Sequence, residues 1–298
     1  MAGISIVHTT ESQGLATSIG QKLGSRPMPV SEIPFMDGEL KVRLAEKPES
    51  QEVLFITRLY PDPNRSLVRA LFVLHYLDSI GKRIRMFVPY MAYARQDREF
   101  LEGESVSIEA VLSQFAHFGV TDLFTVDVHS EKSLSNRSLR MHSISATAAL
   151  ASAVRSAMDT KNAFVVSPDK GAAARAKEFS SLLGVDNFAM DKSRDRLTGE
   201  VKTADIDFDV EGKDAIIVDD MVSTGGSMAN ASSILLRHGC RSVSAAFTHA
   251  LLVDNSREKL SSSGISRIFF TNTISDSDGA IDVSGEVASA IIGNVKEL

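Results

Sequence analysis

Short apolar runs recur along the chain with the length and composition of buried strands. They are rich in Val, Ile, Leu and Phe, and polar residues, glycine or proline bound each of them. This pattern predicts strands at residues 52–57, 85–90, 123–128, 163–168, 215–219, 244–250 and 267–272.

Helical patterns lie between these runs. Apolar residues recur at helical spacing in 107–119, with Ser107 as the expected cap and Gly119 as the expected stop. A second helix is expected over 227–239, ending at Gly239. Because strands and helices alternate, we expect an α/β fold with mostly parallel sheets.

A weak internal repeat indicates two domains. In the first half, "VLFIT" leads through a loop and a long helix to Gly81 and then "KRIRMFVPY". In the second half, "AIIVD" leads through a loop and a helix to Gly239 and then "CRSVSAAFTHA". We expect similar domains over residues 1–141 and 142–298, of which only the second has a glycine loop. The alternative is that all strand–helix–strand units look alike, and the pattern alone leaves it open.

Composition and charge narrow the class of protein. The chain has 298 residues, of which 43% are hydrophobic and 23% charged, as is usual for a globular protein. A net charge of -6 gives no indication of a nucleic-acid partner. The single cysteine, Cys240, excludes an intramolecular disulfide, and we expect a cytoplasmic location. No signal peptide and no run of about 18 apolar residues occurs, so no membrane partner is expected.

The segment "AIIVDDMVSTGGSMAN" (215–230) predicts a sugar-phosphate site. Asp219 and Asp220 are expected at the carboxyl end of a buried strand, where open parallel sheets bind ligands. Backbone amides, hydroxyls and a helix N-terminus would hold a phosphate, while the carboxylates suit sugar hydroxyls. The loop residues concerned are Ser223, Thr224, Gly225, Gly226 and Ser227. The alternative is an exposed turn with a capping serine.

Two segments in the first half are candidates for nucleotide binding. "YARQDR" (93–98) carries Arg95 and Gln96, which suit a polyphosphate and a base edge. "FMDGEL" (35–40) offers Phe35 as a stacking face, with Asp37 and Glu39 as acceptors for a base or ribose. The alternatives are a solvated charged turn and a plain hairpin turn.

Three further segments carry candidate metal ligands and cations. His129 in "VDVHS" and Asp169 in "VVSPDKGAAARA" each follow a predicted strand and could share one Mg²⁺ bound to phosphates. Lys192 and Arg194 lie in the polar segment 190–200, which is either a cationic lid or an ordinary surface loop.

In this order, the segments resemble the ribose-phosphate diphosphokinases, or phosphoribosyl pyrophosphate synthases. The resemblance extends from "FMDGEL" to "THALLV", and "YARQDR" and "IVDDMVSTGGS" are its most specific parts. It implies two type I phosphoribosyltransferase-like domains and transfer of the diphosphoryl group of ATP to ribose 5-phosphate. It also implies a homo-oligomer in which the "FMDGEL" segment completes the ATP site of a neighbouring chain.

The same resemblance implies roles for individual residues. Phe35, Asp37, Gly38, Glu39, Arg95 and Gln96 would bind ATP, and His129 and Asp169 would bind Mg²⁺. Lys192 and Arg194 would be catalytic. Arg194, Asp219, Asp220, Ser223, Thr224, Gly225, Gly226 and Ser227 would bind ribose 5-phosphate.

Ser223 and Lys170 differ from the residues of many relatives and resemble the archaeal-type branch, which is often dimeric or tetrameric rather than hexameric. Two other functions are considered. A phosphoribosyltransferase would not need the ATP segment, and a non-catalytic regulatory homologue would have lost the catalytic residues.

Overall fold

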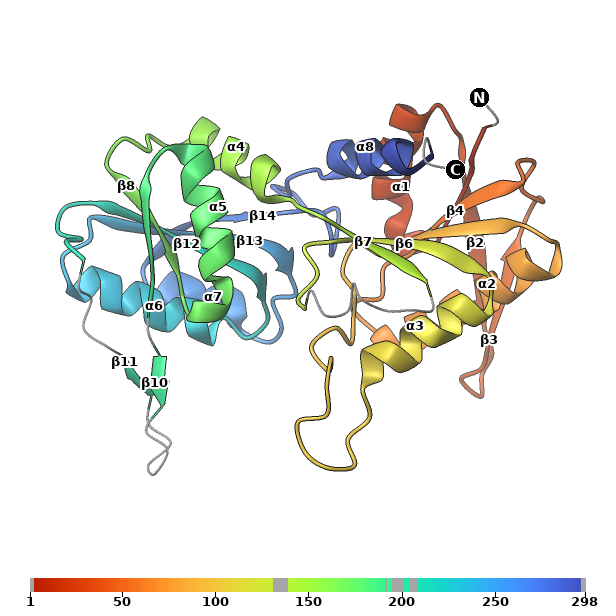
Figure 1. Cartoon of the computed structure of the whole chain (residues 1–298), viewed down its shortest axis with the longest axis horizontal. Helices are drawn as coiled ribbons and strands as arrows, with labels where there is room; N and C mark the ends of the chain where they lie inside the picture. The colour runs from red at the N-terminus through yellow and green to blue at the C-terminus, as the bar shows by residue number, and fades with distance from the viewer. Residues whose placement is uncertain (1–2, 131–138, 191, 195–200, 204–207, 296–298) are drawn as a thin grey trace. The chain divides into compact units, whose positions relative to one another are not determined.

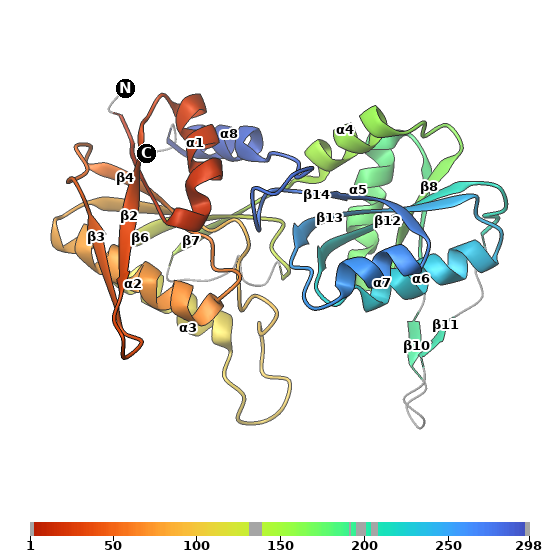
Figure 2. The same cartoon turned by 180° about the vertical axis from the view of Figure 1, so that it is seen from behind.

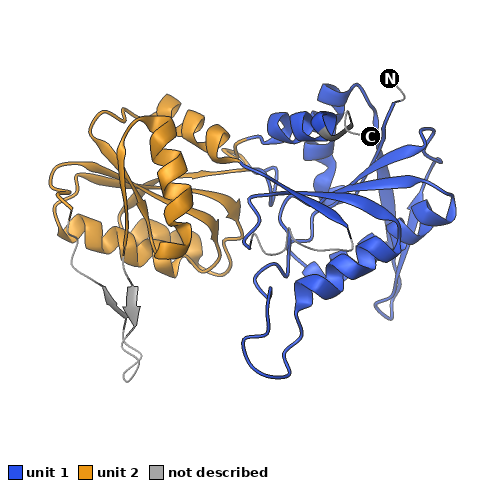
Figure 3. Cartoon of the chain, in the orientation of Figure 1, with its two compact units in different colours: residues 1–145, 272–277, 282–298 blue, residues 146–271, 278–281 orange. Residues whose placement is uncertain are grey.

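The computed structural model describes residues 3–130, 139–190, 192–194, 201–203 and 208–295, with side chains described outside 192–194, 201–203 and 294–295. The chain forms two compact units (Figure 3). Unit 1 contains residues 1–145, 272–277 and 282–298, and unit 2 contains residues 146–271 and 278–281. The sequence-based division into 1–141 and 142–298 stays a prediction about domains, because units of contact need not be units of folding.

Unit 1 is a seven-stranded sheet with helices on both faces (Figure 1). The strand order is β3-β2-β1-β4-β5-β6-β7, and all neighbours are parallel except β2 and β3. Helices α1 and α8 pack together on one face, and α2 and α3 cover the other (Figures 1 and 2). The elements are β1 (Ser5–His8), α1 (Gln13–Leu23), β2 (Pro27–Pro34), β3 (Leu40–Leu44), β4 (Glu52–Ile56), α2 (Pro63–Ser79), β5 (Arg83–Phe87), α3 (Ser107–His117), β6 (Val120–Val126), β7 (Arg140–Ile144) and α8 (Ser284–Val295).

Unit 2 is a five-stranded parallel sheet in the order β14-β13-β12-β8-β9. Helices α4 and α5 pack together on one face, and α6 and α7 cover the other (Figure 2). Strands β10 and β11 form a separate two-stranded antiparallel sheet. The elements are α4 (Thr147–Ala157), β8 (Ala163–Ser167), α5 (Ala173–Leu183), β9 (Asp186–Ala189), β10 (Lys192–Arg194), β11 (Val201–Thr203), β12 (Asp214–Val222), α6 (Gly226–Arg237), β13 (Ser242–Ala250), α7 (Ser256–Ser262) and β14 (Ile265–Phe270).

The two sheets repeat one topology. The strand order β2-β1-β4-β5-β6 in unit 1 corresponds to β9-β8-β12-β13-β14 in unit 2. In both units the helix after the central strand ends at a glycine with positive φ, 70° at Gly81 and 89° at Gly239. Positive φ is costly for other residues, so these glycines end the helices cleanly. The predicted α/β fold and internal repeat are therefore confirmed.

All seven predicted strands are present: six lie inside a sheet that helices cover on both faces, and the seventh, β14, lies at a sheet edge with Ser266 and Arg267 exposed. In β4, residues 53–56 are buried, and in β12, residues 214–218 are buried, as parallel strands covered on both faces require. Two details of the sequence analysis were wrong. Val106, not Ser107, caps α3, and β12 continues past Asp219 to Val222 because β13 pairs with it to Ala250.

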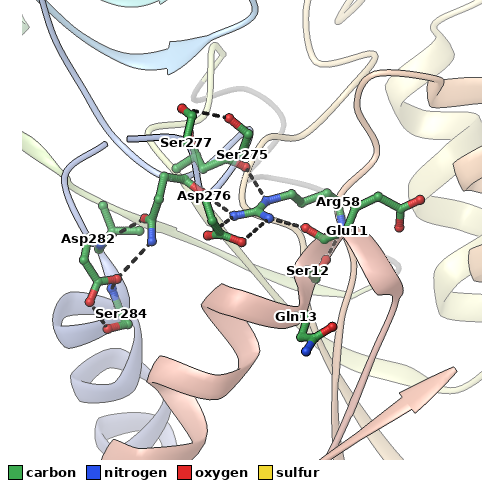
Figure 4. A network of polar contacts seen from close by, with 12 residues as sticks. Glu11, Ser12, Gln13, Arg58, Ser275, Asp276, Ser277, Asp282 and Ser284 are labelled. Atoms are coloured by element: carbon green, nitrogen blue, oxygen red, sulfur yellow. Dashed lines mark hydrogen bonds and ion pairs between the residues drawn. The ribbon is translucent and has the colours of Figure 1, made fainter. Parts of the chain in front are cut away.

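The C-terminal segment returns to unit 1 and is held there by Arg58 (Figure 4). This guanidinium is 2% exposed and makes a bidentate pair with Asp276, at 2.8 and 2.9 Å. It also donates to the carbonyl oxygens of Asn272 and Thr273, at 2.6 and 3.4 Å. Burying a guanidinium is costly unless it is paired, and these acceptors satisfy it. Within the described residues, no helix is both long and apolar enough to cross a membrane.

Candidate active site

Unit 2 has a topological switch point between β8 and β12. Strand β8 pairs with β12 only as far as Ile217, whereas β13 pairs with β12 as far as Val222. Among the described residues, the last residues of β12 therefore have no strand partner on the β8 side, and they lie at the switch point where open α/β sheets bind ligands. Asp219 and Asp220 lie in this part of β12, and Asp169 follows β8.

Negative charge accumulates at this edge of unit 2. Burial, with a further contribution from the neighbouring carboxylates of Asp220 and Asp169, raises the pKa of Asp219 to about 8. The Asp219 carboxylate accepts a hydrogen bond of 2.9 Å from the backbone amide of Asp220, which opposes the rise. A carboxyl group in such surroundings is stabilised by hydroxyl donors or by a cation.

The orientation of Asp169 is fixed locally. Its Oδ1 accepts a hydrogen bond of 3.0 Å from the amide of Gly171, so the residue caps the short helical turn that begins at Lys170. The cap leaves Asp169 at the carboxyl end of β8, where the sequence predicted it.

The glycine loop forms the turn from β12 into α6. Gly225 has φ 72° and precedes the helix, and as a glycine it has no side chain that could accept hydrogen bonds from the amides of the first turn. A Cβ at this position would lie 3.3 Å from Leu260, so space as well as φ favours glycine. The Ser223 carbonyl oxygen accepts a bond of 3.1 Å from Val253, which anchors the loop. A helix N-terminus presented in this way favours an anion.

Unit 1 brings two of its candidate segments together. The segment with Arg95 and Gln96 follows β5, and His129 follows β6, the neighbouring parallel strand. The Ser130 hydroxyl donates to Asp97 at 2.5 Å, which ties the two loops to each other. Arg95 is exposed and Gln96 half-buried, so both are accessible at the carboxyl edge of the sheet.

The segment from Phe35 to Glu39 is the tip of the β2–β3 hairpin. The Phe35 amide donates to the Glu39 carbonyl oxygen at 2.8 Å, and the Asp37 carboxylate accepts from the Glu39 amide at 3.1 Å. Gly38 has φ 92°, which the turn requires. The Phe35 side chain is 49% exposed and Met36 is fully exposed, so the tip presents apolar side chains to its surroundings.

For the two candidate catalytic cations, the structure describes the backbone only. Lys192 and Arg194 lie on β10, but their side chains fall outside the described residues. Among the side chains that are described, no group of three or more His, Cys, Asp or Glu forms a metal site. Sequence reasoning missed two contacts inside irregular loops, from the Ser130 hydroxyl to Asp97 and from the Gln96 side-chain amide to Glu104, because such contacts leave no periodic signal.

A parallel sheet in this strand order, with paired carboxylates and a glycine loop at its switch point, defines a type I phosphoribosyltransferase-like domain, and its topology occurs twice in the chain. Residues 4–119 match the N-terminal domain of ribose phosphate pyrophosphokinase, and residues 140–284 match the phosphoribosyl transferase domain.

Relatives match nearly the whole chain. The ribose-phosphate pyrophosphokinase of Sulfurisphaera tokodaii is 35% identical over 96% of this chain and 99% of the relative. That of Methanothermobacter thermautotrophicus is 33% identical with the same coverage. The fold matches the crystal structure of phosphoribosylpyrophosphate synthetase from Mycobacterium smegmatis, with a TM-score of 0.87 and 24% identity over 99% of this chain and 100% of the other.

The chain belongs to the ribose-phosphate pyrophosphokinase family. It is an enzyme with ribose-phosphate pyrophosphokinase activity. Both of these relatives are archaeal, which confirms the resemblance to the archaeal-type branch.

Proposed function

We propose that unit 2 binds ribose 5-phosphate at its switch point. The loop from Ser223 to Ser227 holds the phosphate, and Asp219 and Asp220 accept hydrogen bonds from the sugar hydroxyls. The observation that carries this assignment is the juxtaposition of the crowded carboxylates with an α6 N-terminus that begins at a glycine. A ligand with a dianion at one end and hydroxyl donors at the other complements both halves.

Unit 1 supplies the residues for ATP. Arg95 and Gln96 bind the nucleotide at the carboxyl edge of the sheet, while Phe35 stacks on the base and Asp37, Gly38 and Glu39 contact the base or ribose. The accessibility of Arg95 and of the Phe35 ring supports these roles. Aromatic faces and arginine forks suit bases and phosphates respectively.

The hairpin acts on the ATP site of a neighbouring chain, so the working enzyme is a homo-oligomer. An exposed apolar tip, with Phe35 and Met36 on a rigid two-stranded hairpin, supports a contact with another chain.

His129 and Asp169 are the proposed ligands of Mg²⁺. The donor chemistry fits the ion: Asp169 and its neighbours in unit 2 are carboxylates that raise the pKa of Asp219, and Mg²⁺ prefers oxygen ligands with several waters retained. When bound, the ion would neutralise charge on phosphate oxygens.

The reaction is a diphosphoryl transfer. The C1 oxygen of ribose 5-phosphate forms a bond to the β-phosphorus of ATP, the bond from that phosphorus to the oxygen bridging the α-phosphate breaks, and AMP leaves. Lys192 and Arg194, at alternate positions of β10, balance negative charge as it moves. The enzyme gains rate mainly by holding two anions in line.

The test is an assay of AMP release with ATP and ribose 5-phosphate, in which phosphoribosyl pyrophosphate is measured in parallel. We expect equal amounts of both products, and no AMP without the sugar phosphate. Consumption of phosphoribosyl pyrophosphate with a nucleobase instead would indicate a phosphoribosyltransferase. No reaction with either set of substrates would favour a regulatory homologue.

A further inference from the structure

The loop between β5 and α3 is organised around one carboxylate. Oε2 of Glu104 accepts three hydrogen bonds, from the amides of Phe100 and Leu101 at 3.0 and 3.2 Å and from the side-chain amide of Gln96 at 3.2 Å. The two backbone donors and Gln96 lower the pKa of Glu104, so the group is ionised at neutral pH. An ionised carboxylate can only accept hydrogen bonds.

This contact determines which way the Gln96 amide faces. Because Glu104 only accepts, the NH₂ group of Gln96 must face it, and the carbonyl oxygen must face away. The Gln96 backbone is held as well, since its amide donates to Tyr93 at 2.9 Å and its carbonyl oxygen accepts from Ile108 at 3.4 Å. The remaining freedom of this residue is in its side chain, which Glu104 restrains.

We propose that Glu104 is a positioning residue that selects adenine by holding the Gln96 carbonyl oxygen outward as a hydrogen-bond acceptor. The proposal rests on the proposed role of Gln96 in binding ATP. The exocyclic amino group of adenine is a donor and suits this oxygen, whereas guanine and hypoxanthine present a carbonyl oxygen at the same position. A freely rotating amide could serve either kind of base, so the restraint supplies specificity.

Glu99 provides a matched control within the same loop. It is an exposed carboxylate whose Oε1 accepts a bond of 2.5 Å from the Gly103 amide, so it too stabilises the loop. The Glu99 carboxylate accepts this bond from the backbone rather than from Gln96. Loss of Glu99 therefore tests loop stability without release of the Gln96 amide.

The experiment measures kcat and KM with ATP and with GTP for Glu104→Ala, Glu104→Gln and Glu99→Ala. For Glu104→Ala we expect the KM for ATP to rise about fivefold, the worth of one hydrogen bond between the neutral Gln96 carbonyl oxygen and the adenine amino group, with kcat within about twofold. The preference for ATP over GTP in kcat/KM should fall, because the amide can turn. Glu104→Gln should retain part of the preference, and Glu99→Ala should retain all of it.

Equal losses with ATP and GTP in Glu104→Ala, or the same change of preference in Glu99→Ala, would overturn the proposal and leave Glu104 a loop-stabilising residue. Gln96→Ala separates this failure from failure of the proposed ATP site. If Gln96→Ala leaves the KM for ATP unchanged, both the role of Gln96 and the inference about Glu104 are wrong. If it raises that KM while Glu104→Ala does not, only the inference about Glu104 is wrong.

Discussion

At the scale of single residues, the switch point of unit 2 places a group that favours hydrogen-bond donors next to a loop that favours an anion. Asp219 lies among carboxylates that raise its pKa, whereas Ser223, four residues later, begins a loop that leads into a helix N-terminus. The Asp219 end of this segment therefore favours hydrogen-bond donors and the loop end favours an anion. A sugar phosphate offers both groups, which supports the proposal that the two features bind one ligand.

Replacing Ser223 tests the binding role of its hydroxyl. We expect Ser223→Ala to raise the KM for ribose 5-phosphate by the worth of one hydrogen bond to a charged group, about 1.5–3 kcal/mol at most. Turnover at saturating substrate should stay near the unsubstituted value, because the backbone of the loop is still held by Val253. Steady-state kinetics measure both constants.

Ser233→Ala is the control, since that hydroxyl bonds within α6 to the Ala229 carbonyl oxygen. A large fall in saturated turnover with an unmoved KM would instead place Ser223 in the chemistry.

Lys192 is the residue for which we expect the largest effect on turnover. Lys192→Ala should lower kcat by orders of magnitude while the KM for ribose 5-phosphate changes little, because a cation that meets the transferring group contributes mainly in the transition state. The control is Lys202→Ala, a lysine on the paired strand β11. Unchanged turnover in Lys192→Ala would remove this residue from the mechanism.

At the scale of elements, the start of α6 depends on one glycine. Gly225→Ala should lower the free energy of unfolding of unit 2 by about 1–2 kcal/mol, because an alanine at φ 72° is strained and its Cβ would lie 3.3 Å from Leu260. Gly226→Ala is the matched control: its nearest neighbour would be Thr224, at 3.9 Å, and no positive φ is involved. Thermal unfolding of the two variants checks the difference. Equal effects would mean that the φ angle of Gly225 is not what the loop requires.

Strands that are apolar runs were predictable from the sequence, whether inside a sheet or, like β14, at its edge, and strands that include proline or mix in polar residues were not. Strands β4 and β12 are continuous apolar runs because helices cover both sides of their sheets. Strand β2 carries Pro27, Pro29 and Pro34 and is mostly exposed or half-buried, so its sequence argues against a strand. The edge strand β7 mixes polar and apolar residues, so it too lacks the apolar run that predicts a strand.

Some contacts of the candidate site could likewise be predicted from the sequence, and others could not. The carboxylates and the glycine loop are contiguous in sequence, so their proximity at the end of β12 could be predicted. The bond from Ser130 to Asp97 joins two loops 33 residues apart and depends on β5 and β6 being neighbours. The hold of Glu104 on Gln96 depends on the path of an irregular loop. Neither contact follows from a hydrophobic pattern, because loops bury little apolar surface.

At the scale of the whole molecule, the two copies of the topology differ in the segment that follows the central strand. In unit 2 the segment after the central strand β12 is a glycine loop suited to an anion. In unit 1 the segment after the corresponding strand β4 begins with Thr57 and Arg58, and the Arg58 guanidinium is buried against Asp276. The edge that could bind an anion in unit 1 is thus used to anchor the C-terminal segment. This difference supports the proposal that unit 2 binds the sugar phosphate and unit 1 the nucleotide.

That division leads to a prediction about the assembly, because the hairpin of unit 1 is proposed to act on a neighbouring chain. An Asp37→Ala/Glu39→Ala chain and a Lys192→Ala chain should each be nearly inactive alone. In a mixed dimer, the second chain provides an intact hairpin and the first an intact Lys192, so one of the two sites is complete. With random exchange into two-fold dimers, about a quarter of the sites should be intact, and activity should recover to that level.

A chain carrying all three substitutions is the control and should rescue neither parent. Exchange is verified with differently tagged chains. If exchanged mixtures stay as inactive as the parents, each ATP site is built from a single chain and the hairpin does not act in trans.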